Sequence, residues 1–585
     1  MIKLFKYMSK KDWSLIFISI IFIVFQVWLD LKLPDYMSEI TALVETEGSD
    51  MNEVLVAGGQ MLLCALGSLA SSICVVGFAS KVASNFSAKL RELQFNQVES
   101  FSMEEINHFS TASLITRSTN DITQIQMFVA MGLQMVIKAP ITAVWAITKI
   151  AGKGWEWSFA TGAAVFALLI MIVVIVILAI PKFKKVQGLT DNINRITREQ
   201  LTGLRVVRAY NAETYQEDKF GKANDELTST NRFTNRVMAI MNPGMQGIMN
   251  GLTLAIYWIG AILIGSAVLM GDKINLFSEM VVFVNYAMQV VMAFMMLSMI
   301  LIMFPRASVA AKRVREVIET PLSIIDGKKK NHSDLKGEVE FKNVSFKYPG
   351  AADYVIKDIS FTAHKGESVA FIGSTGSGKS TLINLVPRFY DASEGEVLID
   401  GMNVKEYSQE DLHDKFGYVP QTAVMFAGTI QSNVAYGDNG KQIYTQDDVK
   451  TAVKVAQAQT FVEKKPDTYN SAVAQGGTNL SGGQKQRLSI ARAICREPEI
   501  YIFDDSFSAL DYKTDRALRL ALNEKTSHIT SLIVAQRIGT IMDADKIIVL
   551  EEGHMVGMGT HKELMETCEV YQEIALSQLS KEELE

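Results

Sequence analysis

Four long runs without a charged residue lie in the first 320 residues, and they constrain the fold more than any other feature. Each is longer than the about 20 apolar residues that a helix needs to cross a bilayer. Two weaker apolar stretches carry one or two charges and complete a set of six. The predicted spans are Trp13–Leu33, Val54–Ser80, Ile122–Thr148, Trp157–Pro181, Val237–Gly271 and Val281–Pro305. An even number of spans places both ends of this region on the same side of the membrane.

Basic residues flank the spans unevenly, which predicts the orientation in the plasma membrane. Lys3, Lys6, Lys10 and Lys11 precede the first span, and seven basic residues follow the fourth between 182 and 208. The loop after the first span holds Glu45, Glu47, Asp50 and Glu53 and no basic residue. Because basic loops stay inside, both termini should be cytoplasmic.

The connections between spans differ in length according to side. The predicted outer loops Lys149–Glu156 and Gly271–Asn275 are short, whereas residues 81–121 and 182–236 are long, polar and free of proline. We expect these inner connections to continue as helices into the cytoplasm, where they could contact a soluble domain.

The net charge changes sign along the chain, and this indicates two unlike parts. Residues 1–320 have a net charge of +3 and the remainder −9. This composition excludes a disordered chain, a collagen-like repeat and a small disulfide scaffold, and it disfavours a nucleic-acid partner. A polar stretch at 326–334 separates the parts. We therefore expect a six-span helical domain over 1–320, a linker over 321–336 and an α/β domain over 337–585.

A few polar residues lie in the apolar runs and are candidates for a substrate cavity. An ionisable group within a span is costly and usually faces a cavity or a partner. Asp30, Asn285 and Gln289 are the candidates, and methionines gather nearby in the last two spans. The alternatives are that Asp30 sits at the headgroup level and that the methionines are ordinary packing.

A phosphate-binding loop follows a buried strand in the second part. Residues 368–372 read as the strand, and a helix follows the loop. Glycines let backbone N–H groups converge on phosphates at a helix N-terminus. The side chain of Lys379 can reach the β- and γ-phosphates, and the Ser380 hydroxyl can bind Mg²⁺. The loop comprises Gly373, Ser374, Thr375, Gly376, Ser377, Gly378, Lys379, Ser380 and Thr381.

Two further motifs follow in order, and together with the loop they resemble the ATP-binding cassette (ABC) superfamily. Ser481, Gly482, Gly483 and Gln484 stand before a helix, and Asp504-Asp505 ends the buried strand 500–503. The six-span domain joined to one cassette resembles the half-transporters among ABC exporters. The resemblance covers nearly the whole chain and implies an α-helical transmembrane domain fused to an α/β P-loop cassette that uses ATP and Mg²⁺.

The resemblance implies a role for each matching residue. Tyr348 matches the aromatic residue that stacks on adenine, and Asp504 matches the Mg²⁺ carboxylate. Gln421 matches the glutamine that touches Mg²⁺ and the attacking water. Ser481, Gly482 and Gly483 match the signature that grips the γ-phosphate bound to the opposite subunit, and Asp511 ends the loop through which the two ATP sites communicate. Phe109–Asp121 and Glu199–Tyr210 resemble the intracellular loops of exporters.

Two departures fall on the hydrolytic step. Asp505 stands where the family usually has a glutamate that polarises water, and Gln536 stands where it has a histidine. Aspartate is shorter by one methylene, or about 1 Å, and misplacement on that scale can cost about 10²-fold in rate. Glutamine cannot carry an imidazolium charge. We expect good ATP binding and weak hydrolysis; the alternative is a harmless variation. A third departure, Ala474–Gly477, has no interpretation.

The motifs resemble the degenerate-site subunit of bacterial heterodimeric multidrug exporters. This implies a second half-transporter as partner and ATP-driven efflux of small, amphipathic substrates. A homodimeric lipid or peptide exporter is one alternative. An ATP-gated regulator or channel that binds nucleotide without turnover is another.

Overall fold

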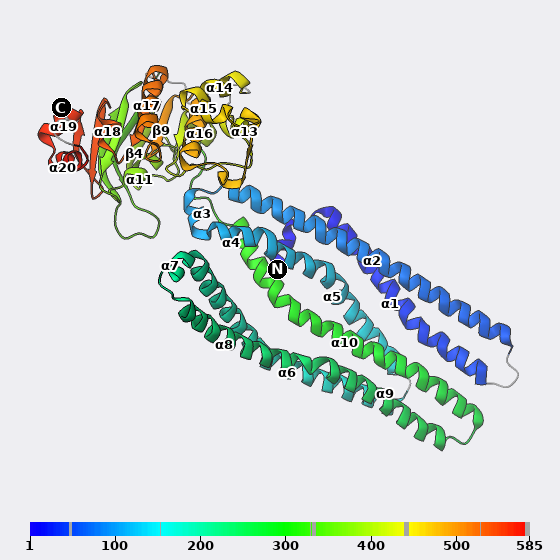
Figure 1. Ribbon diagram of the computed structural model, residues 1–585. Helices are drawn as coiled ribbons and strands as arrows, with labels where there is room; N and C mark the ends of the chain where they lie inside the picture. The colour runs from blue at the N-terminus through cyan, green and yellow to red at the C-terminus, as the bar shows by residue number, and fades with distance from the viewer. Residues whose placement is uncertain are drawn as a thin grey trace. The chain divides into compact units, whose positions relative to one another are not determined.

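The computed structural model divides the chain into two compact units (Figure 1). Unit 1 comprises Met1–Glu99 and Ala112–Thr320, and unit 2 comprises Ser100–Thr111 and Pro321–Glu585. The structure describes residues 1–45, 50–151, 154–327, 329, 335–437, 444–526 and 528–579. Glu47 and most of the polar stretch 326–334 lie outside the described residues.

Unit 1 is built from long helices. Its elements are η1 (Ile2–Tyr7), α1 (Lys10–Glu45), α2 (Met51–Glu99), α4 (Thr111–Thr116), the π-helical η2 (Arg117–Asp121), α5 (Ile122–Ile150), α6 (Trp155–Thr202), α7 (Leu204–Ala209), α8 (Glu213–Ala239), α9 (Met241–Ser266) and α10 (Met270–Ile318). Six helical stretches in the described chain are long and apolar enough to cross a membrane. The prediction of six spans is confirmed.

The helices extend well beyond the membrane. The 48 residues of α6 are about 70 Å long at 1.5 Å per residue, more than twice the hydrocarbon thickness. The inner connections are thus largely helical, as expected. The predicted outer loop Gly271–Asn275 is wrong, because α9 ends at Ser266 and α10 has begun by Met270. Its polar residues Asp272 and Asn275 occupy the first turns of α10, where an acidic group near the helix N-terminus is favourable.

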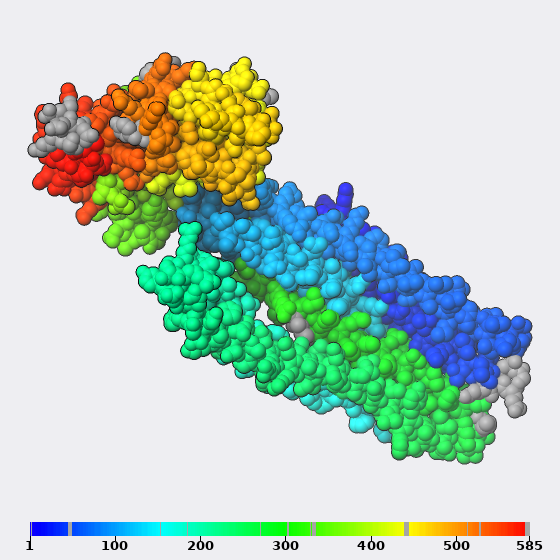
Figure 2. Space-filling model, viewed as in Figure 1, coloured from blue at the N-terminus to red at the C-terminus, as the bar shows by residue number. Residues whose placement is uncertain are grey.

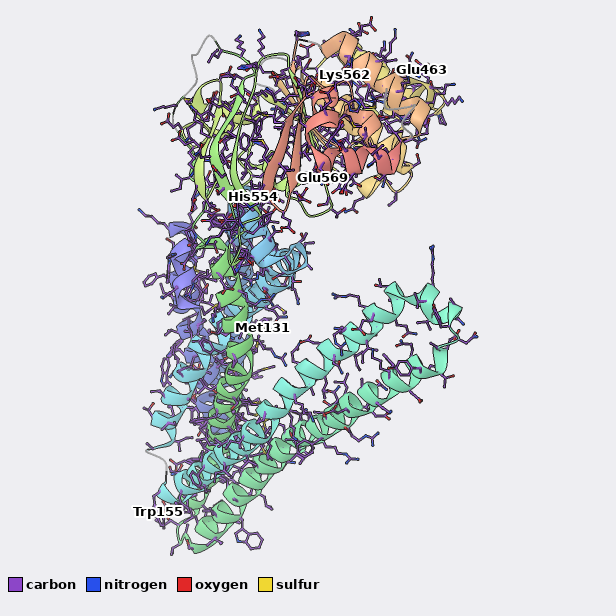
Figure 3. The ribbon with its side chains drawn as sticks, turned by 90° about the vertical axis from the view of Figure 1, so that its left-hand side faces the viewer. Met131, Trp155, Glu463, His554, Lys562 and Glu569 are labelled. Carbon is purple, nitrogen blue, oxygen red and sulfur yellow. The ribbon has the colours of Figure 1, made fainter. Side chains whose placement is uncertain are left out.

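Within unit 1 the C-terminal part of α6 forms a hairpin with α7 and α8 that stands apart from the other helices. Figure 3 shows it diverging from α2, α5 and α10, and in Figure 2 a gap separates its surface from theirs. Exposed apolar side chains cluster at its tip, among them Leu201, Val206, Tyr210 and Tyr215.

The core of unit 1 has two parts. Among the described residues the larger one joins α1, α2, α5, α6, α9 and α10 around Trp157, Phe283 and Tyr286. The smaller one surrounds Phe86 and Leu90 of α2 near the N-terminus.

Unit 2 contains a six-stranded sheet in the order β12-β11-β3-β10-β9-β6. Its strands are β3 (Ser368–Gly373), β6 (Phe416–Val419), β9 (Ile500–Asp504), β10 (Thr530–Val534), β11 (Lys546–Glu551) and β12 (His554–Gly559). All neighbours are parallel except β11 and β12. Because β3, β9 and β10 are adjacent and parallel, the loops after them meet at one edge.

An antiparallel sheet, a two-stranded pair and a set of mostly short helices complete the described part of unit 2. The sheet has the order β2-β1-β4-β5, with β1 (Val339–Phe346), β2 (Ile356–Ala363), β4 (Glu394–Ile399) and β5 (Met402–Asn403). A short pair joins β7 (Gly428–Thr429) to β8 (Ala472–Val473). The helices are α3 (Met103–Phe109), α11 (Lys379–Asn384), α12 (Gln409–His413), α13 (Ile430–Val434), α14 (Gln446–Val455), α15 (Gln459–Glu463), η3 (Thr468–Asn470), η4 (Gln475–Gly477), α16 (Gly482–Cys495), α17 (Tyr512–Thr526), α18 (Ile538–Ile541), α19 (His561–Thr567) and α20 (Glu569–Gln578). The predicted fold class, six spans fused to an α/β cassette, is confirmed.

Candidate nucleotide-binding site

The loop between β3 and α11 forms the centre of the site. Gly376 and Gly378 have φ of 88° and 96°, a region that favours glycine. At Gly373 a Cβ would lie 2.0 Å from the Leu550 carbonyl oxygen, so the backbone passes too close to β11 for any side chain. These glycines shape a cradle that aims the first N–H groups of α11 at its centre, which suits a phosphate group.

The side chain of Lys379 lies inside this cradle. Its Nζ donates hydrogen bonds to the carbonyl oxygens of Gly373 at 2.9 Å and Ser374 at 2.7 Å, and to Ser377 Oγ at 3.2 Å. Burial lowers the pKa of the ammonium group, while Asp505 and Asp504 oppose this shift. A phosphate entering the cradle would offer this partly desolvated cation a charged acceptor in place of neutral ones.

Ser380 and Asp504 meet where a cation would bind. Ser380 Oγ donates to Asp504 Oδ1 at 2.8 Å, and Asp504 is 5% exposed at the end of β9. Burial raises the pKa of Asp504, and the neighbouring Asp505 adds to the rise. The described residues hold no group of three or more His, Cys, Asp or Glu side chains that could bind a metal. A hydroxyl and one carboxylate fit Mg²⁺, which prefers few protein ligands with phosphate and water completing its octahedron.

The Asp505 carboxylate accepts hydrogen bonds from Gln421 and Gln536, the two glutamines that the sequence predicts to take part in hydrolysis. Its Oδ2 accepts from Gln536 Nε2 at 2.8 Å and from Gln421 Nε2 at 3.4 Å. The residue is 7% exposed, and burial raises its pKa although the hydrogen bond from Gln421 lowers it. The ends of β6, β9 and β10 therefore bring these three side chains together.

The loop 508–511 is tied to the same edge of the sheet. Ser508 Oγ donates to the Asp505 carbonyl oxygen at 2.9 Å, and Arg537 donates to the Ser508 carbonyl oxygen at 3.3 Å. Asp511 accepts from the Thr514 backbone and hydroxyl, and these hydrogen bonds lower its pKa. Arg537 gave no signal in the sequence, because only the fold places it beside Ser508.

The signature residues stand at the N-terminus of α16. Ser481 and Gln484 form a reciprocal capping box, with 3.3 Å from Gln484 N to Ser481 Oγ and 3.1 Å from Ser481 N to Gln484 Oε1. Ser481 and Gly482 are exposed and Gly483 is half-buried. Within the described chain no hydrogen bond joins them to the phosphate loop. In the Ala474–Gly477 segment, Lys485 Nζ donates to the Gly476 carbonyl oxygen at 2.9 Å.

In unit 1 the candidate cavity residues have internal partners. Asp30 pairs with Lys138 of α5 at 3.2 Å and accepts a hydrogen bond from Ser68 of α2. Gln289 of α10 donates to the Asp30 carbonyl oxygen at 3.2 Å, so the fold brings these two candidates together. Asn285 Nδ2 donates to the carbonyl oxygen of Val281 in its own helix at 2.9 Å.

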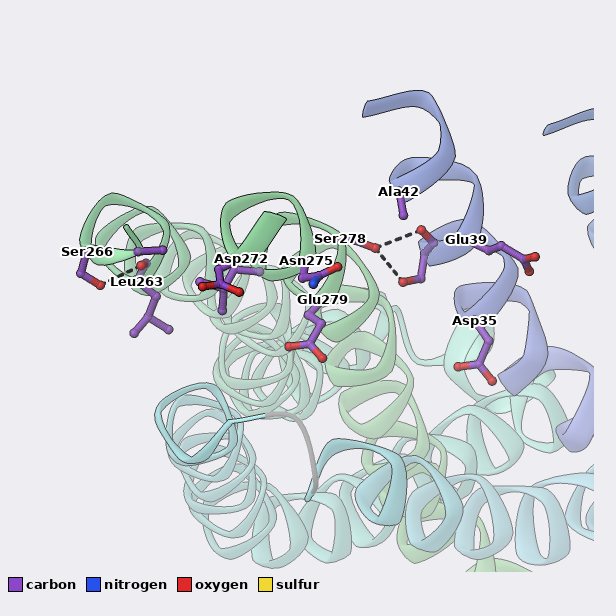
Figure 4. A pocket seen from close by; sticks show the side chains of 12 residues that line it. Asp35, Glu39, Ala42, Leu263, Ser266, Asp272, Asn275, Ser278 and Glu279 are labelled. Atoms are coloured by element: carbon purple, nitrogen blue, oxygen red, sulfur yellow. Dashed lines mark hydrogen bonds between the residues drawn. The ribbon is translucent and has the colours of Figure 1, made fainter. Parts of the chain in front are cut away.

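A second ion pair lies further along α1. Asp35 accepts from Lys149 of α5 at 2.8 Å and from Tyr286 of α10 at 2.5 Å. The sequence did not reveal that Lys138 and Lys149 are the ion-pair partners of Asp30 and Asp35. Asp35 also lines a cavity of about 750 Å³ among the ends of α1, α9 and α10, together with Glu39, Asp272 and Glu279 (Figure 4).

Comparison with known proteins agrees with this geometry. Residues 356–508 match the family model for the ABC transporter, and residues 16–294 match that for the ABC transporter transmembrane region. An ABC transporter ATP-binding protein of Mycobacterium tuberculosis, described as uncharacterized, is 38% identical over 522 residues, covering 89% of this chain and 87% of the relative. The chain belongs to the ABC transporter family.

Other relatives of this ABC transporter include a bacterial lipid transporter. The ATP-dependent lipid A-core flippase of Pseudomonas aeruginosa is 31% identical over 513 residues, covering 88% of this chain and 82% of the flippase. The structure of a bacterial Atm1-family ABC exporter with ATP bound matches with a TM-score of 0.78 over 96% of this chain and 97% of that one, at 24% identity. The exporter-type fold, with membrane domain and cassette in one chain, is thus shown. The chain is a multi-pass membrane transporter of an ATP-hydrolysing family.

Proposed function

We propose that this chain is one half of a heterodimeric ABC exporter and holds the ATP site that binds nucleotide well but hydrolyses it poorly. The observation that carries the proposal is the hydrogen bond from Gln536 to Asp505. In this arrangement the carboxylate that should polarise water is both shorter than glutamate and engaged by a neutral amide. The residues proposed to bind ATP, by contrast, keep the residue types of the family pattern.

The chemistry at this site follows from its residues. The cradle and Lys379 would bind the phosphates, and Tyr348 would stack on the adenine ring. Mg²⁺ held by Ser380, Asp504 and Gln421 would neutralise phosphate charge during transfer. Gln536 can donate a hydrogen bond to the γ-phosphate, but it keeps no positive charge there as a protonated histidine would. Asp505 would reach the attacking water imperfectly, which slows the step.

The partner is inferred from surfaces that one chain leaves open. The exposed signature at α16 would grip the ATP bound to a second cassette, in a head-to-tail pair. The hairpin α6–α8 exposes 79% of Tyr210 and 60% of Val206. Apolar tips of this kind favour burial against another subunit. A partner with the glutamate and histidine would hydrolyse ATP by using the intact signature of this chain.

The substrate is proposed to be small and amphipathic. Met292, Met296 and Met299 on α10 are exposed by 47%, 37% and 52%, and methionine suits surfaces that adapt to varied apolar ligands. Asn285 and Gln289 lie on the same helix and could add polar contacts. Asp30 could contribute only by exchanging its present partners.

The orientation in the plasma membrane is part of the proposal. The basic residues before α1 and at the inner end of α6 support cytoplasmic termini and a cytoplasmic cassette. ATP binding would close the cassettes, and the long inner helices would carry that motion to the spans.

A homodimeric lipid exporter is the second candidate, and its support is the likeness to the lipid A-core flippase. The two functions differ in subunit composition. An affinity-tagged chain purified from its native membranes should bring down a second half-transporter in equal amount. Recovery of one subunit type only, with lipid translocation in vesicles, would favour the homodimer.

ATP-dependent accumulation of an amphipathic dye in inside-out vesicles tests the transport function itself. We expect uptake with ATP and none with the Lys379→Ala variant. ATP-gated conductance without uptake would contradict export and favour a regulator or channel.

A further inference from the structure

The short helix α3 is part of unit 2 and contacts the cassette through Asn107. Asn107 Nδ2 donates a hydrogen bond to the Tyr390 hydroxyl at 3.1 Å. Tyr390 lies in the segment that follows α11, about ten residues after the phosphate loop. The hydrogen bond therefore joins α3 to the part of the cassette that carries the phosphate loop.

The Tyr390 ring packs against the ring proposed to stack on adenine. The rings of Tyr348 and Tyr390 are 5.3 Å apart and perpendicular, at 88°. Phe346 completes a cluster of three rings, 5.0 Å from Tyr348 and 5.5 Å from Tyr390. Edge-to-face pairs at such distances contribute beyond their buried area.

The Tyr348 side chain is thus held at two places. Its hydroxyl shares a hydrogen bond of 2.9 Å with Thr381 Oγ1 in the first turn of α11. Its ring packs nearly perpendicular to the rings of Tyr390 and Phe346. A cavity of about 480 Å³ adjoins the ring pair and is lined also by Ser102, Glu104 and Ile324. Because space remains beside them, the angle of the Tyr348 ring depends on these few contacts and not on tight packing all around.

The helix α3 is itself firmly anchored. Glu105 is 6% exposed and accepts from the backbone and hydroxyl of Ser102 at 2.8 and 2.6 Å. Its other oxygen accepts from the Ser323 backbone at 2.7 Å. Burial opposes ionisation of Glu105, but these hydrogen bonds prevail and lower its pKa. Because these hydrogen bonds hold α3 in place, a displacement of the Tyr390 hydroxyl would alter its hydrogen bond with Asn107.

We propose that Tyr390 is a positioning residue that orients the Tyr348 ring for adenine stacking and links that ring to α3 through Asn107. The inference rests on the proposed stacking role of Tyr348. Adenine stacked on Tyr348 would restrain the Tyr390 ring through the contact between the two rings, and the hydrogen bond to Asn107 would pass this restraint to α3. The phosphates would bind to the loop 373–381, which in the described chain touches Tyr348 only through the hydroxyl of Thr381, so this link responds mainly to the base.

The first test compares two ligands that differ in the base. ATP and inorganic tripolyphosphate are titrated onto the full-length chain in lipid nanodiscs, with Mg²⁺ present. Tyr390→Leu should weaken ATP binding about 3–10-fold, the range for losing one aromatic pair. Tripolyphosphate affinity should not change, and Tyr257→Leu at an exposed position on α9 is the matched control. An equal loss for both ligands would overturn the positioning role, since it would indicate a general structural defect.

A double-mutant cycle separates this inference from the proposed site. If Tyr390 acts through Tyr348, then Tyr390→Leu should have little further effect in a Tyr348→Leu background. Additive losses would contradict the link between the rings. If Tyr348→Leu leaves ATP affinity unchanged, the stacking role itself fails. Loss with Tyr348→Leu but none with Tyr390→Leu would overturn only the present inference.

The second test measures the link to α3 with conservative variants. Hydrogen exchange of residues 100–111 should slow when ATP binds to the wild-type chain, but not when tripolyphosphate binds. Asn107→Ala and Tyr390→Phe should each abolish this protection, and Asn107→Ala should lower the affinity for ATP less than Tyr390→Leu does. Asn224→Ala at an exposed position on α8 is the control. Protection that persists in both variants would show that the hydrogen bond does not carry the signal.

Discussion

Gln536 Nε2 donates a 2.8 Å hydrogen bond to Asp505 Oδ2, so the two residues proposed to impair hydrolysis are direct partners. Asp505 has a φ of 46° and its backbone N–H donates to the Val534 carbonyl oxygen at 3.0 Å, which fixes its position at the sheet edge. The two departures therefore act as a unit.

Restoring both residues should activate the site. The variant Asp505→Glu/Gln536→His lengthens the carboxylate and supplies a protonatable ring. In the complex with the partner half-transporter, with the partner's own site silenced, ATP hydrolysis at this site should therefore rise about 10–100-fold. Each single change should give less, because the two side chains share one step. Phosphate release is the measurement. A double variant with no gain would place the defect elsewhere, with Ala474–Gly477 as the remaining departure.

Removing the ammonium group of the phosphate loop should strongly weaken nucleotide binding. Lys379→Ala deletes three hydrogen bonds to the loop and a buried cation facing the phosphates. ATP affinity should fall more than about 10-fold, since charge-assisted hydrogen bonds to phosphate are among the strong ones. Calorimetric titration checks this, with Lys562→Ala on α19 as an exposed control. Unchanged affinity would contradict the assignment of the cradle.

The buried carboxylates should make stability depend on pH. Burial raises the pKa of Asp504 above its ordinary value near 3.8, so the folded chain keeps a proton that the unfolded chain has lost. Without nucleotide, the contribution of Asp504 to stability should be greatest at low pH. It should decline as the pH rises through the interval between the pKa of Asp504 in the unfolded chain and its higher pKa in the folded chain. The binding of MgATP, which needs the ionised carboxylate, should strengthen over the same interval.

The variant Asp504→Asn tests this sign directly. It removes a buried charge next to Asp505, so the unfolding temperature without nucleotide should rise by a few degrees, for about 1 kcal/mol. Stabilisation by MgATP should largely disappear. A lower unfolding temperature in the absence of nucleotide would contradict the account, because it would show that the ionised carboxylate stabilises the empty site.

The sequence predicts features that depend on local pattern and misses those that depend on distant pairing. Charge-free runs predicted the spans, because a bilayer demands continuous apolar helix. Gly373 to Thr381 predicted the phosphate loop, because its glycines serve a local backbone shape. Lys138, 108 residues from Asp30, and Asn107, 283 residues from Tyr390, carry no local signal. Only the fold brings each pair together.

Neutralising one member of the Asp30–Lys138 pair should destabilise unit 1. Asp30→Asn leaves the Lys138 ammonium without its carboxylate, at an expected cost of roughly 1–3 kcal/mol for a partly buried pair. The double variant Asp30→Asn/Lys138→Met should be more stable than the single one, because no charge is left unpaired. Thermal unfolding in lipid nanodiscs distinguishes them. Equal destabilisation would show that the pair has no coupling.

ATP hydrolysis by the purified chain alone in lipid vesicles tests the central claim most directly. The chain should release phosphate no faster than its Lys379→Ala variant, whereas the complex with its partner half-transporter should turn over ATP. Robust hydrolysis by the chain alone that Lys379→Ala abolishes would show that Asp505 and Gln536 form a working site, and it would contradict the division of labour proposed here.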